Sequence, residues 1–295
     1  MRPILLDNAI EAWKAAIRFC NDIKRGKATL QYQKNFVSSL HNAVELIMKQ
    51  MLLNNNDHRV AEIRQPNNES EAKLLLDYFK ATDLNYFFDT LPNESLSKFH
   101  TIGFEKLISL REKIFGHCLE QGEQGKLLEG LQLLKRRRND ETHFMIRQGS
   151  FLSERDFCVL HNFMIKFYKI MKTWWPTSDC ELESNIFLYI DWFSLIKDDS
   201  IYRFDCEPLQ DFSYKDAVRN SRLAKEIAEI LKENHLIGAY DCSSFGIADD
   251  LRSELSVEFD EIWTMVSMMK SLDLIVVDKI QDEQGNTFNR IKVLL

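Results

Sequence analysis

The most constraining feature of the sequence is a pair of long amphipathic segments near its start. In residues 4–27 and again in residues 36–51, apolar side chains recur at the spacing of one helix face. Gly26 marks the end of the first segment, because glycine favours a helix end. Because an apolar stripe must be buried against another apolar surface, the sequence predicts two long antiparallel helices that pack against each other.

Helical periodicity continues to Pro176, and we expect an all-α domain over residues 1–176. Ser153 stands three residues before Asp156, which matches the capping box of a helix N-terminus. Pro176 would end the helix that begins there. The further segments with helical character are 72–80, 84–89, 102–115, 125–138 and 153–175.

The last third of the chain has a different pattern. Residues 177–210 are expected to form a linker and docking segment. Two amphipathic helices are then expected, and after them two β-rich runs on either side of a turn that contains Gly285. This order is typical of a winged helix-turn-helix, so we predict a mainly α protein with a smaller α+β winged-helix-like domain at residues 211–295. The helices are expected at 214–234 and 259–271, and the strands at 274–280 and 288–295.

Charge and cysteine usage limit the class of protein. The chain has 38 basic and 45 acidic residues, a net charge of -7, which excludes a generally basic nucleic-acid coat but allows a local basic patch. The six cysteines form no CxxC pair, so we expect reduced thiols rather than a disulfide framework or a zinc site. Without a signal peptide or an apolar run of ~20 residues, the sequence predicts a cytoplasmic protein that does not enter a membrane.

The candidate site lies in residues 131–148, LQLLKRRRNDETHFMIRQ. At 100° per residue, Arg138 continues the apolar stripe of Leu131 and Leu134, whereas Arg136 points the opposite way. Arg138 is therefore directed at a packed surface. A guanidinium is always charged and is unfavourable when buried alone, so Arg138 implies a nearby carboxylate, phosphate or partner chain.

His143 is the second important residue of this stretch. In an unbroken helix His143 would lie about 140° around the axis from Arg138, too far for both to hold one small group. Asn139, Asp140 and Thr142 are poor residues for a helix interior. We therefore expect the helix to break between Arg138 and His143, or the two side chains to meet across a dimer.

An arginine followed at this distance by a histidine is a weak pattern by itself. Arg111 with His117 and Arg155 with His161 also fit it. Both pairs are expected within regular helices, where a step of six residues separates the side chains by about 120°. We interpret these two pairs as structural.

The string RNDETH, residues 138–143, resembles the RNxxxH motif of HEPN domains, the higher eukaryotes and prokaryotes nucleotide-binding superfamily of small helical bundles. The amphipathic segment SLHNAVELIMKQML also resembles the corresponding helix of these domains. The resemblance covers about residues 5–176. It implies a HEPN-like helical bundle that forms a homodimer, with the motif of each protomer lining one cleft, and for many members a metal-independent ribonuclease activity.

The resemblance also implies roles for three residues. Arg138 would position the phosphate, Asn139 would orient polar groups, and His143 would be the general acid or base. Cleavage of RNA by its own 2'-hydroxyl needs a proton carrier near neutral pH and a cation beside the phosphorane, which histidine and arginine supply. The expected products are a 2',3'-cyclic phosphate and a 5'-hydroxyl, and neither a metal nor a cofactor is expected.

The neighbouring residues leave alternatives open. Lys135, Arg136 and Arg137 are either phosphate contacts that give sequence-independent RNA affinity or a solvated cationic face. Some HEPN toxins have a tyrosine two residues after the histidine, where this chain has Met145, and this puts neutralisation by nucleotidylation of such a tyrosine in doubt.

Two functions from different classes follow. The first is an endoribonuclease of toxin or phage-defence type, with an antitoxin or sensor protein as partner. The alternative is a non-catalytic HEPN dimerisation module, in which Arg138 pairs with Asp140 or Glu141 and the C-terminal domain binds a partner or DNA. That C-terminal region has 16 acidic and 10 basic residues. Such a balance suits protein contact better than phosphate contact.

Overall fold

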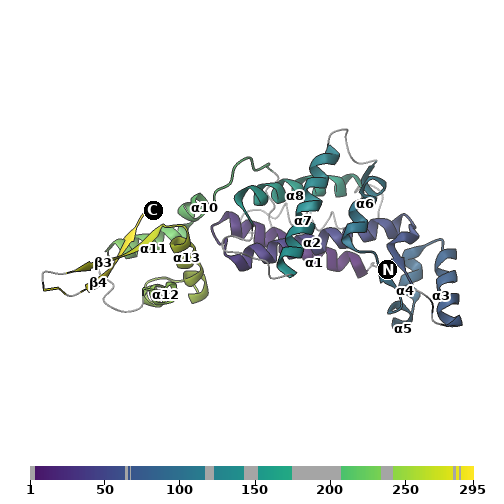
Figure 1. Ribbon diagram of the computed structural model, residues 1–295, viewed down its shortest axis with the longest axis horizontal. Helices are drawn as coiled ribbons and strands as arrows, with labels where there is room; N and C mark the ends of the chain where they lie inside the picture. Colours follow the sequence, from purple (N-terminus) through teal and green to yellow (C-terminus); the bar gives the residue numbers. More distant parts are fainter. Residues whose placement is uncertain are drawn as a thin grey trace. The chain divides into compact units, whose positions relative to one another are not determined.

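The protein is mainly helical, as predicted (Figure 1). The described residues form twelve α-helices, one 3-10 turn and two small antiparallel two-stranded sheets. No helix among them is long and apolar enough to cross a membrane. The computed structural model describes residues 4–63, 66, 68–116, 123–142, 152–174, 207–233, 242–281, 284–285 and 287–295.

Contacts divide the chain into two compact units that do not follow chain order. The first consists of Met1–Arg18, Phe36–Arg147 and Val159–Pro208. The second consists of Phe19–Asn35, Gln148–Cys158 and Leu209–Leu295. The predicted domain boundaries near residues 176 and 211 stay a prediction, because a division by contacts does not show which segments fold on their own. The predicted linker at 177–210 lies outside the described residues except for its last four positions.

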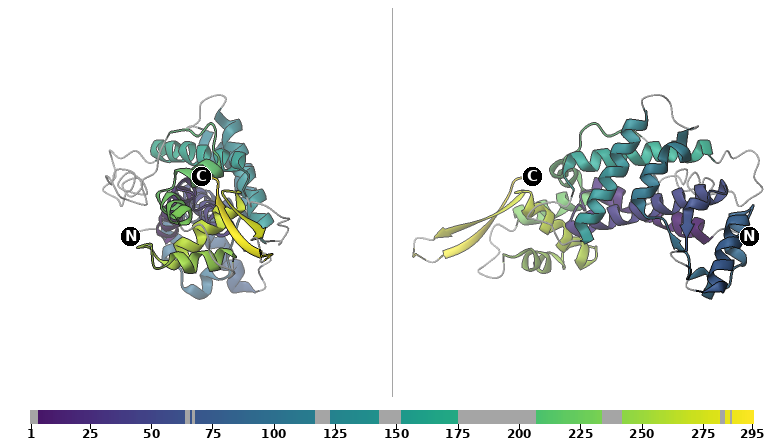
Figure 2. Two further views of the ribbon diagram at one scale, coloured as in Figure 1. Left: turned by 90° about the vertical axis from the view of Figure 1, so that its left-hand side faces the viewer. Right: turned by 45° about the vertical axis from the view of Figure 1, so that its right-hand side comes forward.

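The first unit is a helical bundle with a small subdomain at one side. Its bundle elements are α1 (Ile4–Lys24), α2 (Leu30–Asn54), α6 (Phe104–Phe115), α7 (Glu123–Thr142) and α8 (Glu154–Trp174), of which α1, α2 and α8 also contribute to the second unit. Helices α1 and α2 are joined by a connection of five residues and lie side by side in Figures 1 and 2, as the predicted antiparallel pair requires.

Aromatic rings from three helices meet in the bundle core. The Phe167 ring of α8 lies 6.0 Å from Trp13 of α1, 5.9 Å from Phe115 of α6 and 5.6 Å from Phe163, measured between ring centroids. All four side chains are buried. Aromatic contacts of this kind add about 0.5–1.5 kcal/mol each beyond the burial of their area. The cluster therefore ties α1, α6 and α8 into one core.

Helix α7 approaches α8 closely at Gly130. A Cβ atom added to Gly130 would lie 2.3 Å from Cδ2 and 2.7 Å from Cβ of Phe163. Only a glycine allows this approach, because the clash involves the base of the phenylalanine side chain as well as its ring. The contact brings the leucine stripe of α7 into the core, where Leu127, Leu131 and Leu134 are fully buried.

The subdomain of the first unit is organised around Tyr78. Its ring lies within 5.6 Å of those of Phe79, Phe87, Phe88 and Phe99. A two-stranded sheet that was not predicted pairs residues on either side of the small helices. The elements are η1 (His58–Val60), β1 (Ala61–Glu62), α3 (Glu69–Lys80), α4 (Leu84–Thr90), α5 (Asn93–Leu96) and β2 (His100–Thr101).

The second unit joins the turn between α1 and α2 to residues near the C-terminus. The buried Gln33 side chain donates through Nε2 to the Ala28 carbonyl at 2.7 Å and accepts from the Leu152 amide at 2.8 Å. The Tyr214 hydroxyl donates to the Leu152 carbonyl at 3.1 Å. The Asp156 amide donates to Ser153 Oγ at 3.1 Å, which confirms the predicted cap.

The C-terminal part of this unit has four helices and a hairpin. Its elements are α10 (Tyr214–Asn220), α11 (Arg222–Glu233), α12 (Ser244–Leu251), α13 (Phe259–Ser271), β3 (Ile275–Gln281) and β4 (Thr287–Val293). The hairpin, drawn in yellow tones in Figure 2, agrees with the predicted strands to within two residues. The single helix expected at 214–234 is wrong, because the chain is extended at Ser221 between α10 and α11.

The contact at Gly130 leads to a matched pair of stability predictions. Gly130→Ala should destabilise the protein, because overpacking of about 1–3 kcal/mol exceeds the roughly 1 kcal/mol gained in helix propensity. Gly125→Ala, in the same helix but with nothing within 4 Å of the added Cβ, should stabilise it by up to about 1 kcal/mol. Urea unfolding of both variants measures the difference. Shifts of the same sign would contradict the close packing of α7 on α8.

Candidate active site

The candidate site occupies the last turns of α7, where the apolar stripe gives way to cations. Leu131 and Leu134 are fully buried, and the next residues along the helix are Lys135, Arg136 and Arg137. Burial of the stripe sets the rotation of the helix about its axis. The direction of each cation is therefore determined by core packing and not by the cations themselves.

Helix α7 extends four residues beyond the end at Arg138 that the sequence predicts, and the predicted break before His143 stays a prediction. Helix α7 continues through Asn139 and Asp140 to Thr142. The Asp140 carboxylate accepts from Arg137 Nη1 at 3.3 Å, one turn earlier, and so supports the last turn. Each poor helix former is disfavoured by less than about 1 kcal/mol, which continued backbone hydrogen bonding can offset.

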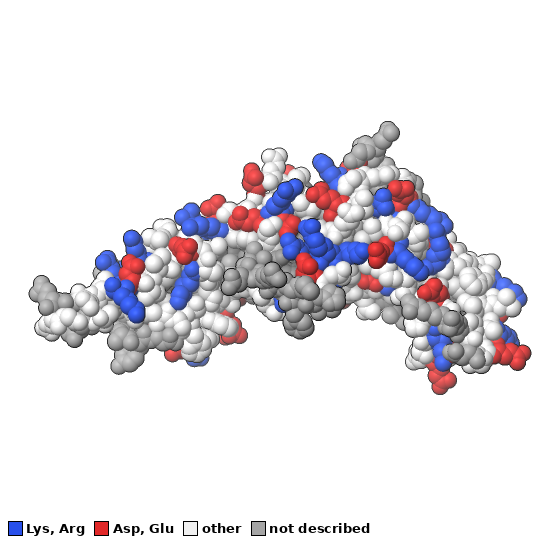
Figure 3. Space-filling model, viewed as in Figure 1, with Lys and Arg blue, Asp and Glu red and all other residues white. Residues whose placement is uncertain are grey.

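The cations differ in exposure as helical phase predicts. Arg136 is exposed and Arg138 is half-buried, and Asn139 is exposed beside it. Lys135 Nζ lies 2.8 Å from Glu105 Oε1 of α6, and the Glu105 side chain is 78% exposed. The hydrogen bond from Lys135 and its positive charge lower the pKa of the Glu105 carboxyl. Figure 3 shows Lys and Arg side chains gathered over α7 and α6.

His143, the predicted general acid or base, lies outside the described residues, as do Met145 and His117. The structure thus brings Lys135 to Asn139 together on α7 and does not place the histidine relative to them. Had the helix continued by one further residue, Arg138 and His143 would diverge by about 140°.

The two competing arginine and histidine pairs remain interpreted as structural. Arg111 donates through Nη1 to the Ile108 carbonyl at 3.2 Å and through Nη2 to Glu112 at 3.0 Å. His161 is wholly buried in α8. A side chain without solvent access cannot contact a substrate, so the Arg155 and His161 pair is excluded as a site.

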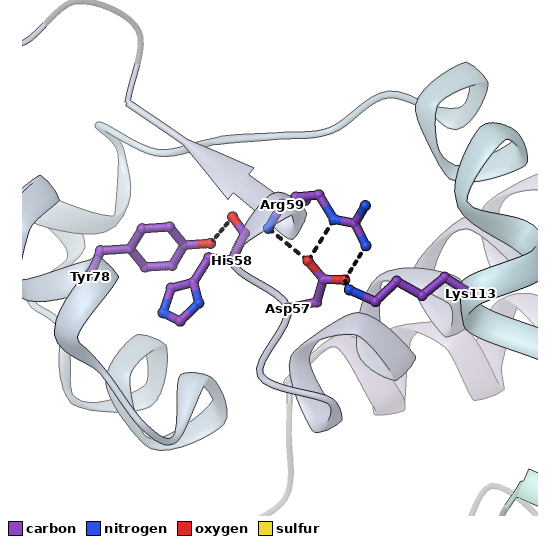
Figure 4. A network of polar contacts seen from close by, with 5 residues as sticks. All are labelled: Asp57, His58, Arg59, Tyr78 and Lys113. Atoms are coloured by element: carbon purple, nitrogen blue, oxygen red, sulfur yellow. Dashed lines mark hydrogen bonds and ion pairs between the residues drawn. The ribbon is translucent and has the colours of Figure 1, made fainter.

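A second cationic group, which the sequence analysis missed, surrounds Asp57 in the same unit (Figure 4). Asp57 follows α2 and caps η1, accepting from the Arg59 amide at 3.1 Å. Its carboxylate also accepts from Arg59 Nε at 2.9 Å and from Nη2 at 2.6 Å, a bidentate pair. Lys113 Nζ of α6 lies 2.9 Å from the same carboxylate. One buried acid thus holds two basic side chains.

These contacts change the titration of the network. The hydrogen bonds from Arg59, aided by Lys113 and opposed by burial, hold the pKa of the Asp57 carboxyl well below its ordinary value. On the other side of η1, the Tyr78 hydroxyl donates to the His58 carbonyl at 2.6 Å, and burial raises the pKa of Tyr78 to about 12. Asp57 is therefore ionised, and Tyr78 neutral, throughout the physiological range.

Sequence spacing offered only a weak signal for this network. Asp57 and Arg59 are two positions apart, which suggests a local cap, but Lys113 is distant in the chain. Metal binding has no obvious site: the described residues contain no group of three or more His, Cys, Asp or Glu side chains that could hold an ion.

Comparisons of the chain with protein-family models, curated proteins and solved structures find no match.

Replacement of Asp57 should destabilise the protein in a pH-dependent way. Asp57→Asn removes charge-assisted hydrogen bonds worth about 1–3 kcal/mol in total. The folded pKa is depressed, so the stabilisation is present above the unfolded pKa of about 3.9 and is lost as the pH falls toward the folded pKa. The difference in the free energy of unfolding between wild type and variant, measured with urea, should be largest at pH 7 and should decrease below about pH 4.

Asp89→Asn is the matched control, since Asp89 is exposed on α4 and the substitution removes the same charge. Its effect should stay within about 0.5 kcal/mol at every pH. If the loss of stability caused by Asp57→Asn does not change with pH, the stabilisation does not come from the ionised Asp57 carboxylate.

Proposed function

We propose that this protein is a metal-independent endoribonuclease of toxin or phage-defence type, with a HEPN-like helical bundle as its catalytic part. The observation that carries the proposal is the end of α7, where a core-packed helix carries Lys135 to Asn139 in its last two turns. The RNxxxH string begins there, at Arg138. A fixed row of cations favours binding of a polyanion, because little side-chain freedom is lost on contact.

Each residue has a defined part in the proposed reaction. Arg138 binds the scissile phosphate and stabilises the charge that grows on it. His143 moves the proton between the 2'-hydroxyl and the leaving 5'-oxygen, and Asn139 orients polar groups beside it. Lys135, Arg136 and Arg137 contact neighbouring phosphates without reading sequence.

A homodimer is part of the proposal because of the course of α7. The helix is continuous through Thr142, so there is no break that turns His143 back toward Arg138 within residues 139–142. A site shared by two protomers lets Arg138 of one chain act with His143 of its partner.

The C-terminal helices and hairpin are proposed to be a winged-helix-like regulatory domain. Support comes from the order of α11, α12, α13 and the β3–β4 hairpin. Its acidic balance favours a protein partner, an antitoxin or a sensor, over DNA.

A non-catalytic dimerisation module is the second candidate, and one observation favours it. Lys135 already pairs with Glu105, and Arg137 with Asp140. Cations that serve only to hold α7 in place need no nucleic acid. Salt-dependent DNA binding or partner binding by the C-terminal domain, without RNA cleavage, would support this candidate.

The catalytic proposal predicts RNA cleavage by the purified protein in EDTA. His143→Ala and Arg138→Ala should each abolish cleavage without unfolding the chain, which a thermal unfolding curve checks. His100→Ala is the control, because His100 is exposed on β2 and outside the proposed site, and it should cleave like wild type. Products with 2',3'-cyclic phosphate ends are expected. Undiminished cleavage by both site variants would refute the assignment.

The dimeric site predicts complementation between inactive chains. When Arg138→Ala and His143→Ala proteins are mixed and allowed to exchange subunits, the heterodimers regain one intact arginine and histidine pair across the interface. Part of the wild-type activity should therefore return. If the two residues act within one chain, no heterodimer contains an intact pair and activity stays absent.

A further inference from the structure

The network around Asp57 has more positive charge than it needs to hold itself together. Within the part of the chain that the structure describes, Asp57 is the one carboxylate that both Arg59 and Lys113 contact. The carboxylate side chain is only 6% exposed, whereas those of Arg59 and Lys113 are 48% and 61% exposed. The acid is thus an internal anchor, and both cationic groups face solvent.

Both cations keep hydrogen-bond donors for a further anion. Arg59 uses Nε and Nη2 on Asp57, and among the described residues no acceptor contacts its Nη1. Lys113 has three ammonium protons and contacts Asp57 alone within the same part of the chain. In Figure 4 one terminal nitrogen of the Arg59 guanidinium lies on the side away from the Asp57 carboxylate.

The spacing of these donors matches one phosphate group. Arg59 Nη2 keeps a second N–H beside the one that it donates to Asp57. Arg59 Nη2 and Lys113 Nζ lie 2.6 Å and 2.9 Å from the same Asp57 oxygen, so the two nitrogens are at most about 5.5 Å apart. Charge-assisted bonds to a phosphate oxygen are about 2.7–2.9 Å long. Two groups this close can therefore donate to a single phosphate at once.

The group also continues toward α7 through α6. Lys106 precedes Lys113 by two turns, about 10.5 Å along the helix axis, and its side chain is 66% exposed. Its neighbour Glu105 contacts Lys135 of α7. Basic side chains thus occur on α7, on α6 and beside η1. Figure 3 shows Lys and Arg side chains gathered over α7 and α6.

We infer that Arg59 and Lys113, anchored by Asp57, form a binding subsite for a backbone phosphate of the RNA whose neighbouring phosphates lie on α7. This inference rests on the proposed function, since RNA is the substrate there, but it assigns residues outside the motif. The bound group is a phosphodiester. The subsite makes no contact with a base, so it contributes affinity and direction without sequence preference.

The first test measures RNA affinity without cleavage. In the full-length His143→Ala protein, Arg59→Gln together with Lys113→Gln should weaken binding of labelled oligouridylate about tenfold at low salt. The slope of log affinity against log salt should fall by about 0.7, the value for one phosphate of a single strand. Fluorescence anisotropy over a salt series measures both quantities.

Lys73→Gln with Lys80→Gln is the matched control, because both lysines are exposed on α3 and the substitutions remove the same charge. These changes should leave the affinity and the slope unchanged. An equal loss in the control pair would reduce the effect to overall charge and overturn the inference.

A second measurement leaves Arg59 and Lys113 unchanged, so it does not depend on how the double variant folds. Bound oligouridylate should protect the Lys113 amine of the His143→Ala protein from acetylation, while Lys73 and Lys80 react as they do without RNA. Peptide mass spectrometry measures the three rates. Unprotected Lys113 together with full RNA affinity in the double variant would overturn the subsite.

Further outcomes of these experiments distinguish RNA from free phosphate as the ligand, and the subsite from the catalytic assignment. Protection by inorganic phosphate or a free nucleotide, but not by oligouridylate, would overturn RNA as the ligand. Loss of RNA affinity in the double variant, in a protein that cuts no RNA, would support the subsite while the catalytic assignment fails. If the wild-type protein cleaves RNA but the double variant binds RNA with unchanged affinity, the catalytic assignment is supported and the subsite is overturned.

Discussion

The close approach of α7 to α8 at Gly130 is the contact on which the candidate site depends. Phe163 lies against the glycine so closely that a β-carbon would not fit. This approach buries the leucine stripe of α7 and so determines which side of the helix faces solvent. Arg136 is exposed and Arg138 half-buried as a consequence. The presentation of charge follows from hydrophobic packing, because packing sets the rotation of a helix.

Carboxylates hold the basic side chains of the first unit in defined positions. Glu105 holds Lys135, and Asp57 holds both Arg59 and Lys113. An anchored cation has already lost much of its rotamer freedom, so it loses less on binding an anion. In a chain with a net charge of -7, positive potential must be local, and these pairs show where it is concentrated.

The second unit shows that contacts in this protein do not follow chain order. Gln33 uses both ends of its amide to join the residues after α1 to the start of α8. Lys27 pairs with Glu261 of α13 at 2.7 Å, and Gly26, at a φ of 93°, lies against the backbone of Val218. These bonds connect segments more than a hundred residues apart. No local pattern in the sequence encodes such a pairing, because each partner lies far from the other in the chain.

The sequence by itself determined the long helices of the bundle, the C-terminal hairpin, the cap at Ser153 and the phase that separates Arg136 from Arg138. These features depend on side-chain spacing within a few turns, which can be read from the chain. The end of α7 could not be read, because Asn139 and Asp140 disfavour a helix only weakly. Tertiary structure alone decided which acids anchor which cations. Asp57 meets Lys113 only after α2 and α6 have packed into one bundle, since ion pairs form between side chains that the core has already brought together.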